Sequence, residues 1–389
     1  MRTYARKPDF PTETEIVVTC ASGVESALKK EIFRLFQKEV PAINGAFTFK
    51  GSVSDVVKAN LNLRTAERVY IKTGDFEAKS FDELFDGVKA VRWEDFITAD
   101  GKVTVNGKCV KSVLFSISDC QRIIKKAVAD RLCEKFGYNR LPESGAEYHL
   151  EFSVFKDRVA VMIDTSGVAL HKRGYRDKTG VTPIKETLAS AILFYSDFYR
   201  IRPFYDPFCG SGTFVIEGAR IALNIAPGID RRFAFNDWKN FDEKLYFSLK
   251  QEAADGVRDI KIDFCGSDID AKAVKLAEYH AKRAGVSGAV KFSVKAVKDF
   301  KPRQDFGTVV TNPPYGVKAS DIRSAEESYK DFGCVMKDFP AWSVFAIVKD
   351  GKRFEKFFGR KSDRERKLYN SELECRLKYY YGKNSEKGN

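Results

Sequence analysis

The sequence predicts an α/β fold in which a doubly wound parallel sheet follows two smaller α+β units. From residue 186 onward, apolar segments typical of strands alternate with amphipathic helical segments, and a glycine-rich turn follows the first strand. Changes in composition divide the chain before that point. We expect units over residues 1–70 and 71–165, a basic linker over 166–185, and the parallel sheet over 186–389.

Hydrophobic periodicity predicts the elements of the first two units. In the first unit we expect strands over 16–18, 46–49 and 68–71, with helices over 24–35 and 53–63. In the second unit we expect helices over 80–88 and 119–136, with strands over 102–105, 113–116, 148–154 and 159–163. The helix over 119–136 carries several Lys and Arg side chains that could face either RNA or solvent.

The C-terminal unit is predicted to begin with a helix over 185–195 and a strand that ends at Asp206. A helix from Gly212 and a polar and aromatic insertion over 224–262 follow. The remaining expected elements are strands over 263–266, 290–294, 308–310 and 344–348, and helices over 271–283 and 324–339. In such a sheet, ligands bind at the carboxyl ends of the strands.

The charge balance indicates a polyanionic partner. The chain has 67 Lys and Arg against 54 Asp and Glu, a net charge of +13, and nucleic acid is the leading candidate, with an ordinary solvated surface as the alternative. Eight scattered cysteines without a Cys-x-x-Cys pair, and three histidines, predict no metal site. No apolar stretch is long enough to span a membrane and no apolar leader opens the chain, so we expect a cytoplasmic protein.

The turn after the first strand of the C-terminal unit has the form of a cofactor loop. The segment Asp206-Pro-Phe-Cys-Gly-Ser-Gly-Thr213 places a carboxylate and two glycines before a helix start, where free N–H groups attract an anionic ligand group. The third glycine of a dinucleotide fingerprint is Val215 here. The carboxylate of Asp206 suits a ligand with an ammonium group, such as S-adenosylmethionine.

A second acidic segment is expected at the end of the next parallel strand. Asp268 stands where folds of this kind bind a ribose, and because it follows Gly212 by 56 residues, the chain between them must contain an insertion. Asp270 has two interpretations, a ligand-binding role and a helix N-cap, and the N-cap is favoured.

The segment Asn312-Pro313-Pro314-Tyr315 directly follows an apolar strand. An exocyclic amine on a base is a poor nucleophile because its lone pair is shared with the ring. An Asn side-chain oxygen and a rigid backbone carbonyl can accept its two protons, which directs the lone pair toward a methyl donor. The prolines fix the carbonyl, and Tyr315 can stack on a base that has left its helix.

Several motifs together resemble the THUMP-containing large-subunit rRNA guanine-N2 methyltransferases. They are the two segments above, Leu170-His-Lys-Arg-Gly-Tyr-Arg176, Pro183-Ile-Lys-Glu-Thr-Leu-Ala189 and Arg366-Lys-Leu-Tyr-Asn370. The resemblance covers nearly the whole chain. It implies a ferredoxin-like N-terminal unit, a THUMP RNA-binding domain and a Rossmann-like methyltransferase domain that uses S-adenosylmethionine.

The resemblance also implies roles for individual residues. The cofactor would be held by Asp206, Gly210, Ser211, Gly212 and Asp268, and the base would be held and activated by Asn312, Pro313, Pro314 and Tyr315. The family usually has an acid after the third strand for the adenine amino group. Ala296 stands there instead, with Asp299 out of register, so we expect apolar packing and backbone groups to hold adenine. Ser371 replaces a frequent glycine.

The implied reaction is methylation of the exocyclic N2 amine of a guanine in 23S rRNA, or in a large-subunit assembly intermediate, without a covalent enzyme intermediate. The alternatives are a tRNA guanine-N2 methyltransferase and a non-catalytic RNA-binding factor in ribosome assembly. Cys209, His171 and His280 are assigned to packing or surface roles. The residues predicted to contact RNA phosphates are Lys172, Arg173, Arg176, Arg364, Arg366 and Lys367.

Overall fold

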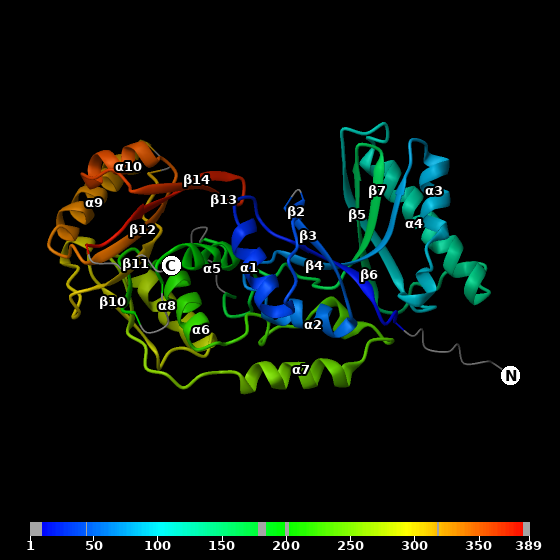
Figure 1. Ribbon diagram of the computed structural model, residues 1–389, viewed down its shortest axis with the longest axis horizontal. Helices are drawn as coiled ribbons and strands as arrows, with labels where there is room; N and C mark the ends of the chain where they lie inside the picture. The colour runs from blue at the N-terminus through cyan, green and yellow to red at the C-terminus, as the bar shows by residue number, and fades with distance from the viewer. Residues whose placement is uncertain (1–9, 44, 178–183, 199–201, 317–318, 384–389) are drawn as a thin grey trace.

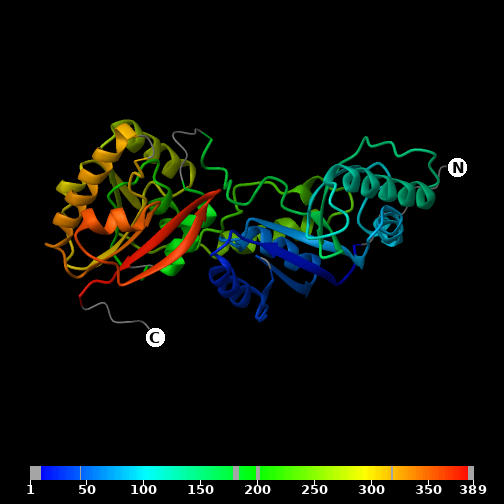
Figure 2. The same ribbon diagram turned by 90° about the horizontal axis from the view of Figure 1, so that it is seen from above.

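The computed structural model describes residues 10–43, 45–177, 184–198, 202–316 and 319–383. Their strands form two seven-stranded sheets, which lie toward opposite ends of the long axis (Figure 1, Figure 2). The second sheet is doubly wound, so the predicted fold class is confirmed. Among the described residues, no helix combines the length and apolar character needed to cross a membrane.

The first sheet has the strand order β2-β3-β1-β4-β7-β6-β5, and its pairs are antiparallel except β5 with β6. Its strands are β1 (Thr14–Thr19), β2 (Ala42–Ile43), β3 (Ala46–Gly51), β4 (Arg68–Glu77), β5 (Lys102–Val110), β6 (Glu147–Phe155) and β7 (Arg158–Asp164). The helices of this region are α1 (Glu25–Phe36), α2 (Val53–Asn62), α3 (Phe81–Ala90), η1 (Trp93–Asp95) and α4 (Ile117–Phe136).

Strand β4 belongs to both N-terminal units. Its first part pairs with β1 through Lys72, and its second part pairs with β7 from Tyr70 onward. The pairing with β7 shifts register between Lys72 and Gly74. The predicted division at residue 70 therefore falls inside one continuous strand, and the domain boundaries stay a prediction.

The second sheet has the order β10-β9-β8-β11-β12-β14-β13, with five parallel strands followed by an antiparallel pair. Its strands are β8 (Phe204–Asp206), β9 (Phe264–Asp268), β10 (Val290–Val294), β11 (Gly307–Thr311), β12 (Trp342–Val348), β13 (Arg364–Asn370) and β14 (Leu373–Tyr380). Its helical elements are α5 (Glu186–Tyr195), α6 (Thr213–Ala222), α8 (Ala271–Arg283), η3 (Val297–Asp299), α9 (Ala319–Met336) and α10 (Gly351–Phe358). The strand order reverses between β8 and β11, which is where such sheets bind ligands.

The strand predicted over 113–116 is wrong. Strand β5 continues to Val110, and a loop then leads to α4, which Ser116 caps. Of the apolar side chains in this loop, only Leu114 is buried, and Val113 and Phe115 are exposed. Helix α10 and strands β13 and β14 were not predicted, and together they complete the second sheet and its cover.

The insertion after α6 packs against the N-terminal units. It contains η2 (Ala234–Asp237) and α7 (Glu243–Asp255), and α7 lies beside α2 (Figure 1). The Trp238 ring stacks on Tyr148 of β6 with a centroid distance of 5.0 Å, and Phe235 is fully buried in the core of the first sheet. This aromatic insertion therefore completes the hydrophobic core of units that lie far from it in the chain.

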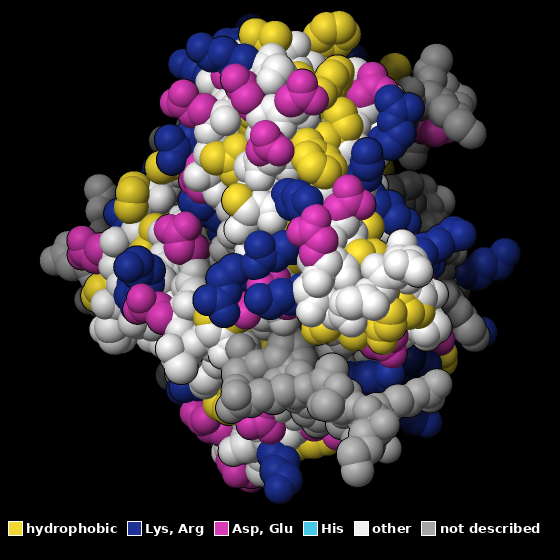
Figure 3. Space-filling view, turned by 90° about the vertical axis from the view of Figure 1, so that its right-hand side faces the viewer, with side chains coloured by type: hydrophobic (Ala, Val, Ile, Leu, Met, Phe, Trp, Pro, Cys, Tyr) yellow, Lys and Arg dark blue, Asp and Glu magenta, His cyan; other side chains and the backbone are white. Residues whose placement is uncertain are grey.

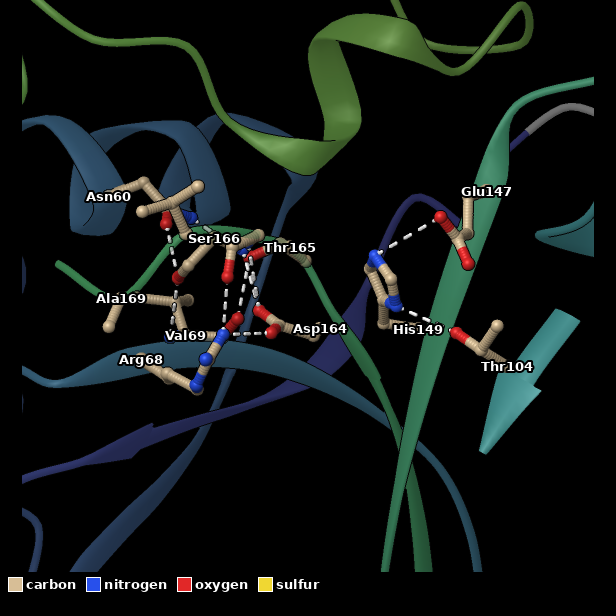
Figure 4. A network of polar contacts seen from close by, with 12 residues as sticks. Asn60, Arg68, Val69, Thr104, Glu147, His149, Asp164, Thr165, Ser166 and Ala169 are labelled. Carbon is tan, nitrogen blue, oxygen red and sulfur yellow. Dashed lines mark hydrogen bonds and ion pairs between the residues drawn. The ribbon is translucent and has the colours of Figure 1, made fainter. Parts of the chain in front are cut away.

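The segment that leaves β7 is fixed by a polar network (Figure 4). One Asp164 oxygen accepts the Ser166 N–H at 2.8 Å, and the other is paired with Arg68. The Ser166 hydroxyl donates to the Asn60 side chain at 2.7 Å. This network ties α2 and β4 to the start of the segment, which we call the connecting segment (residues 164–177).

Arg231 of the insertion holds the same segment from the other side. Its buried guanidinium donates to the carbonyls of Ala169 at 2.9 Å and Lys172 at 3.1 Å. It also donates to the carbonyls of Ser166 at 3.3 Å and Val168. Residues 166–177 of the predicted linker are thus bound to two parts of the protein, and 178–183 lie outside the described residues.

Candidate active site

The cofactor loop lies between β8 and α6, as predicted. Gly210 and Gly212 have φ angles of 51° and 86°, which side-chain-bearing residues rarely adopt. A Cβ atom on Gly212 would lie 2.9 Å from the Cβ of Ala277, so glycine there allows α8 to approach closely. A Cβ on Gly210 would meet no atom within 4 Å, so this glycine faces open space. The loop therefore has one packed side and one side open to a ligand.

Asp206 is buried at the end of β8. One of its carboxylate oxygens accepts hydrogen bonds from the Thr311 hydroxyl at 2.6 Å and the Phe208 N–H at 3.1 Å. Burial raises the pKa of Asp206 to about 7, and the nearby charge of Asp268 adds to the rise. A cationic ligand group would favour the ionised form of this carboxyl.

Asp268 stands at the end of β9, next to the cofactor loop. Its two oxygens accept the N–H groups of Gly210 and Asp270, both at 2.9 Å. Asp270 caps α8, because its side chain accepts the Lys272 N–H at 2.8 Å. The favoured interpretation of Asp270 is confirmed.

The segment Asn312–Tyr315 begins directly after β11. The side-chain oxygen of Asn312 is buried and, among the described residues, has no hydrogen-bond partner. The Tyr329 hydroxyl of α9 donates to the Pro314 carbonyl. On the other side, the Cys375 Sγ lies 3.7 Å from the Tyr315 hydroxyl, and burial raises the pKa of Tyr315 well above its usual value. The motif is thus held by α9 and β14.

The two motifs meet because β8 and β11 are neighbours in the sheet. The Thr311–Asp206 hydrogen bond links them directly, a role for Thr311 that was not predicted although it immediately precedes the motif. Ser211 adds a second buried side-chain oxygen without a partner in the described part of the chain. Because buried polar groups are normally hydrogen-bonded, these two oxygens are candidate contacts for a polar ligand.

The region predicted to hold adenine also contains a residue that the sequence did not indicate. Ile269 follows Asp268 directly, and its side chain is 76% exposed. Ala296 is half-buried and Asp299 is exposed on η3. An exposed aliphatic side chain next to Asp268, the acid predicted to bind ribose, fits the expected apolar packing of adenine, and both roles stay predictions.

The structure also places the three residues that were assigned to packing, surface or structural roles. Cys209 is buried, and burial raises the pKa of its thiol well above the usual value. His280 is buried with its Nδ1 3.2 Å from the Ser211 carbonyl, and His171 lies 3.5 Å from a carboxylate oxygen of Glu67. Among the described residues, no group of His, Cys, Asp and Glu side chains could hold a metal ion.

Most of the basic residues predicted to contact RNA are engaged within the protein. Arg173 is only 2% exposed and donates to the carbonyls of Leu170 at 2.7 Å and Arg64. Arg176 forms an ion pair of 2.8 Å with the buried Glu186. Both arginines hold the connecting segment, and the burial of Arg173 and the ion pair of Arg176 do not fit the predicted phosphate contacts.

The basic residues of β13 and the connecting segment differ in exposure. Arg366 lies over the Tyr195 ring at 4.0 Å from its centroid and donates to the Gly23 carbonyl at 3.4 Å, which joins β13 to the start of α1. Lys367 pairs with Glu374 at 2.6 Å. Lys172 is exposed and remains a candidate phosphate contact.

An open hollow of about 570 Å³ adjoins Tyr315. It is lined by Gly316, by the start of α10, and by charged side chains of β13 and β14, and Lys349 enters it from the end of β12. The Lys349 charge lies close enough to the Cys375 thiol to lower its pKa against the larger effect of burial. The sequence did not indicate Lys349 as a site residue, because it is a single lysine after an apolar strand and belongs to no motif.

Comparisons with known proteins agree with this architecture. Residues 15–70 match the RlmL ferredoxin-like domain, residues 78–164 match the THUMP domain, and residues 173–379 match the RMKL-like methyltransferase domain. A Bacillus subtilis (strain 168) protein, YpsC, described as an RNA methyltransferase, is 40% identical over 95% of this chain and 96% of its own length.

Solved structures show the same fold. The crystal structure of SMU.472, a methyltransferase complexed with SAH, is 39% identical, covers 97% of this chain and all of its own, and has a TM-score of 0.91. A Listeria monocytogenes protein named as an N6-adenine-specific DNA methylase is 42% identical over 95% of this chain and 97% of its own, also with a TM-score of 0.91. With these matches across all three regions, the chain belongs to the THUMP-containing RMKL-like RNA methyltransferases, whose cofactor is S-adenosylmethionine.

Proposed function

We propose that the protein transfers a methyl group from S-adenosylmethionine to the exocyclic N2 amine of a guanine in 23S rRNA or in a large-subunit assembly intermediate. The buried, unpartnered side-chain oxygen of Asn312 within the described residues carries the proposal. Leaving such an oxygen unsatisfied costs about 1–3 kcal/mol in the absence of a ligand. A planar amine that enters the site would satisfy it.

Two acceptors can hold the amine. The Asn312 oxygen takes one proton, and the Pro314 carbonyl already accepts from Tyr329, so we assign the second proton to the Pro313 carbonyl. With both protons held, the nitrogen lone pair is turned out of conjugation with the ring. Tyr315 is held from β14 and lines the hollow, where we place one edge of the base.

The cofactor loop fits S-adenosylmethionine. Asp206 supplies a carboxylate for the ammonium group, Gly210 leaves open space, and Ser211 has an unsatisfied hydroxyl in the described part of the site. Asp268 is positioned for the ribose hydroxyls and Ile269 for apolar contact with adenine. When bound, the cofactor supplies an electrophilic methyl group, and these residues orient it toward the end of β11.

The test is transfer of labelled methyl from S-adenosylmethionine to purified 23S rRNA and, separately, to bulk tRNA, with mass spectrometry of the nucleosides. N2-methylguanosine found only in rRNA supports the proposal. The same product found only in tRNA would show that tRNA, and not rRNA, is the substrate. N6-methyladenosine would show that the target base is adenine and not guanine, in line with the name of the Listeria relative. No transfer to either RNA would favour a non-catalytic role.

Asn312→Ala tests the assigned role of Asn312. It removes one acceptor without touching Asp206 or the cofactor loop. We expect a 10²- to 10³-fold loss of kcat, the size found when one preorganised group at a reacting centre is removed. The affinity for S-adenosylhomocysteine, measured by calorimetry, should stay within about twofold of the wild-type value. Retained activity in this variant would contradict the assigned role of Asn312.

A further inference from the structure

Exposed apolar side chains gather at the far end of the first sheet. We call this group the tip patch, and it consists of Val110, Val113, Phe115, Ile117 and Phe155. Phe115 is 82% exposed and Val113 is 60% exposed. Val110 and Phe155 are register partners across β5 and β6, so the loop after β5 and the turn after β6 form one surface. Figure 3 looks onto the right-hand end of Figure 1, where hydrophobic side chains lie near the top among basic and acidic ones.

The loop that presents the patch is held by its own hydrogen bonds. The Val113 N–H donates to the Asp157 carboxylate at 2.8 Å, and the Asp157 N–H donates to the Ser112 hydroxyl at 3.1 Å. The Ser112 hydroxyl and the Lys156 N–H both donate to the Val110 carbonyl, at 3.0 and 3.3 Å. This bonding fixes the backbone in a form that turns Val113 and Phe115 toward solvent.

Positive charge surrounds these apolar side chains. Lys108, Lys111 and Lys156 are exposed, and none of the three forms an ion pair within the described residues. The Lys156 ammonium lies 5.5 Å from the centre of the Phe155 ring. Within the loop, the Asp157 carboxylate accepts the Val113 N–H and keeps its negative charge. The patch therefore combines apolar contact area with exposed lysines that, in the part of the chain that the structure describes, form no ion pair.

Clustered apolar exposure marks an interaction site, whereas single exposed apolar residues are ordinary. An aromatic ring and aliphatic side chains provide stacking surface for bases, and flanking lysines attract phosphates. In a duplex the base faces are stacked inside and cannot reach such a surface. A second copy of this chain would place like charges against each other. Unpaired RNA offers base faces to the apolar side chains and phosphates to the lysines.

We propose that the tip patch binds unpaired bases of the RNA substrate, with Phe115 as the stacking residue and Lys111 and Lys156 on the flanking phosphates. The contact lies at the end of the first sheet, away from the candidate active site in the second (Figure 1). This proposal rests on RNA being the substrate, as membership of an RNA methyltransferase family indicates. It does not depend on which base is methylated.

The experiment measures binding of a mixed-sequence 20-nucleotide RNA, single-stranded or annealed to its complement, by fluorescence anisotropy without cofactor. Phe115→Ala should weaken single-strand binding about tenfold, as expected when one stacked base loses its platform, and should leave duplex binding unchanged. Phe115→Trp should retain the wild-type single-strand affinity. Phe247→Ala is the matched control, because Phe247 is an exposed phenylalanine on α7, and it should leave both affinities unchanged.

The lysines are tested by salt dependence. In Lys111→Ala/Lys156→Ala, the slope of log affinity against log salt for the single strand should be shallower by about 1.4, or about 0.7 for each lost phosphate contact. Single-strand binding by Phe115→Ala equal to wild type would overturn the proposal. A wild-type protein that sediments as a dimer, with a Phe115→Ala variant that sediments as a monomer, would also overturn it, because the patch would then join two copies of the chain. Because no methyl transfer is measured, failure here is distinct from failure of the proposed function.

Discussion

The Thr311 hydroxyl donates a hydrogen bond of 2.6 Å to the carboxylate of Asp206. Thr311 is the last residue of β11 and Asp206 is the last residue of β8, so the bond crosses between two neighbouring parallel strands. One side of this bond leads into the cofactor loop and the other leads directly into Asn312. The position of the cofactor acid and the position of the base-holding motif are therefore coupled.

Thr311→Val should weaken the binding of S-adenosylhomocysteine. A hydrogen bond to a charged group contributes about 1.5–3 kcal/mol, which corresponds to roughly a 10- to 100-fold loss of affinity at pH 7.5. Titration calorimetry measures the change. Thr311→Ser keeps the hydroxyl and should bind within about threefold of wild type, and equal losses in both variants would show that shape rather than the hydrogen bond matters.

Cofactor affinity should depend on pH through Asp206. Burial raises the pKa of this carboxyl to about 7, and the ionised form is the one that pairs with an ammonium group. Affinity for S-adenosylhomocysteine should therefore rise about tenfold per pH unit between pH 5.5 and 6.5 and level off above pH 7. In Asp206→Asn the same rise should be absent.

The same carboxyl affects stability with the opposite sign. The folded protein keeps the Asp206 proton to a higher pH than the unfolded chain does. Its contribution to the free energy of unfolding therefore falls as the pH rises from about 4 to 7 in the absence of ligand. Asp206→Asn should remove this part of the pH dependence in thermal unfolding, and an unchanged profile would contradict the raised pKa.

Arg231→Ala should destabilise the protein strongly. The substitution leaves four backbone carbonyls of the connecting segment without their donor. We expect a loss of about 3 kcal/mol, equivalent to a fall in Tm of roughly 6–12 °C. Arg232→Ala is the control, since Arg232 is exposed and its ion pair with Asp237 lies on the surface, and it should change Tm by less than about 2 °C.

Arg173→Ala should lower Tm without changing the salt dependence of RNA binding. Its guanidinium binds two backbone carbonyls in the interior and has no access to phosphates. The neighbouring Lys172 is exposed, and Lys172→Ala should leave Tm unchanged while it makes the salt slope shallower by about 0.7 for single-stranded RNA. A shallower slope in Arg173→Ala would restore the original prediction for this residue.

The motifs of the candidate site could be predicted from the sequence because their chemistry is local. The strand, acid, glycine turn and helix start from Asp206 to Gly212 follow one another along the chain, and so do Asn312 and the prolines. Their proximity follows from the strand order of a doubly wound sheet. The Thr311–Asp206 bond needs the register of β8 with β11, which no local pattern reveals.

The wrong predictions share one cause: a local sequence pattern does not show whether a side chain is buried in the folded protein. Arg173 carries the same charge as Lys172, yet it lies inside while Lys172 lies outside. The segment around Phe115 has the composition of a buried strand, but its hydrogen bonds turn it toward solvent. The aromatic residues of the insertion, such as Phe235, fill a core that belongs to distant parts of the chain.

The continuity of β4 limits how this protein can be divided or recombined. A fragment that starts or ends at residue 70 would cut a strand that is paired on both sides and expose its backbone donors and acceptors as an unprotected edge. A fragment cut before the insertion would also lose Trp238 and the partner helix of α2. For transplantation between relatives, an exchangeable module therefore has to include residues 14–177 together with 224–262, two pieces that are separate in the gene and joined by Arg231 in the folded molecule.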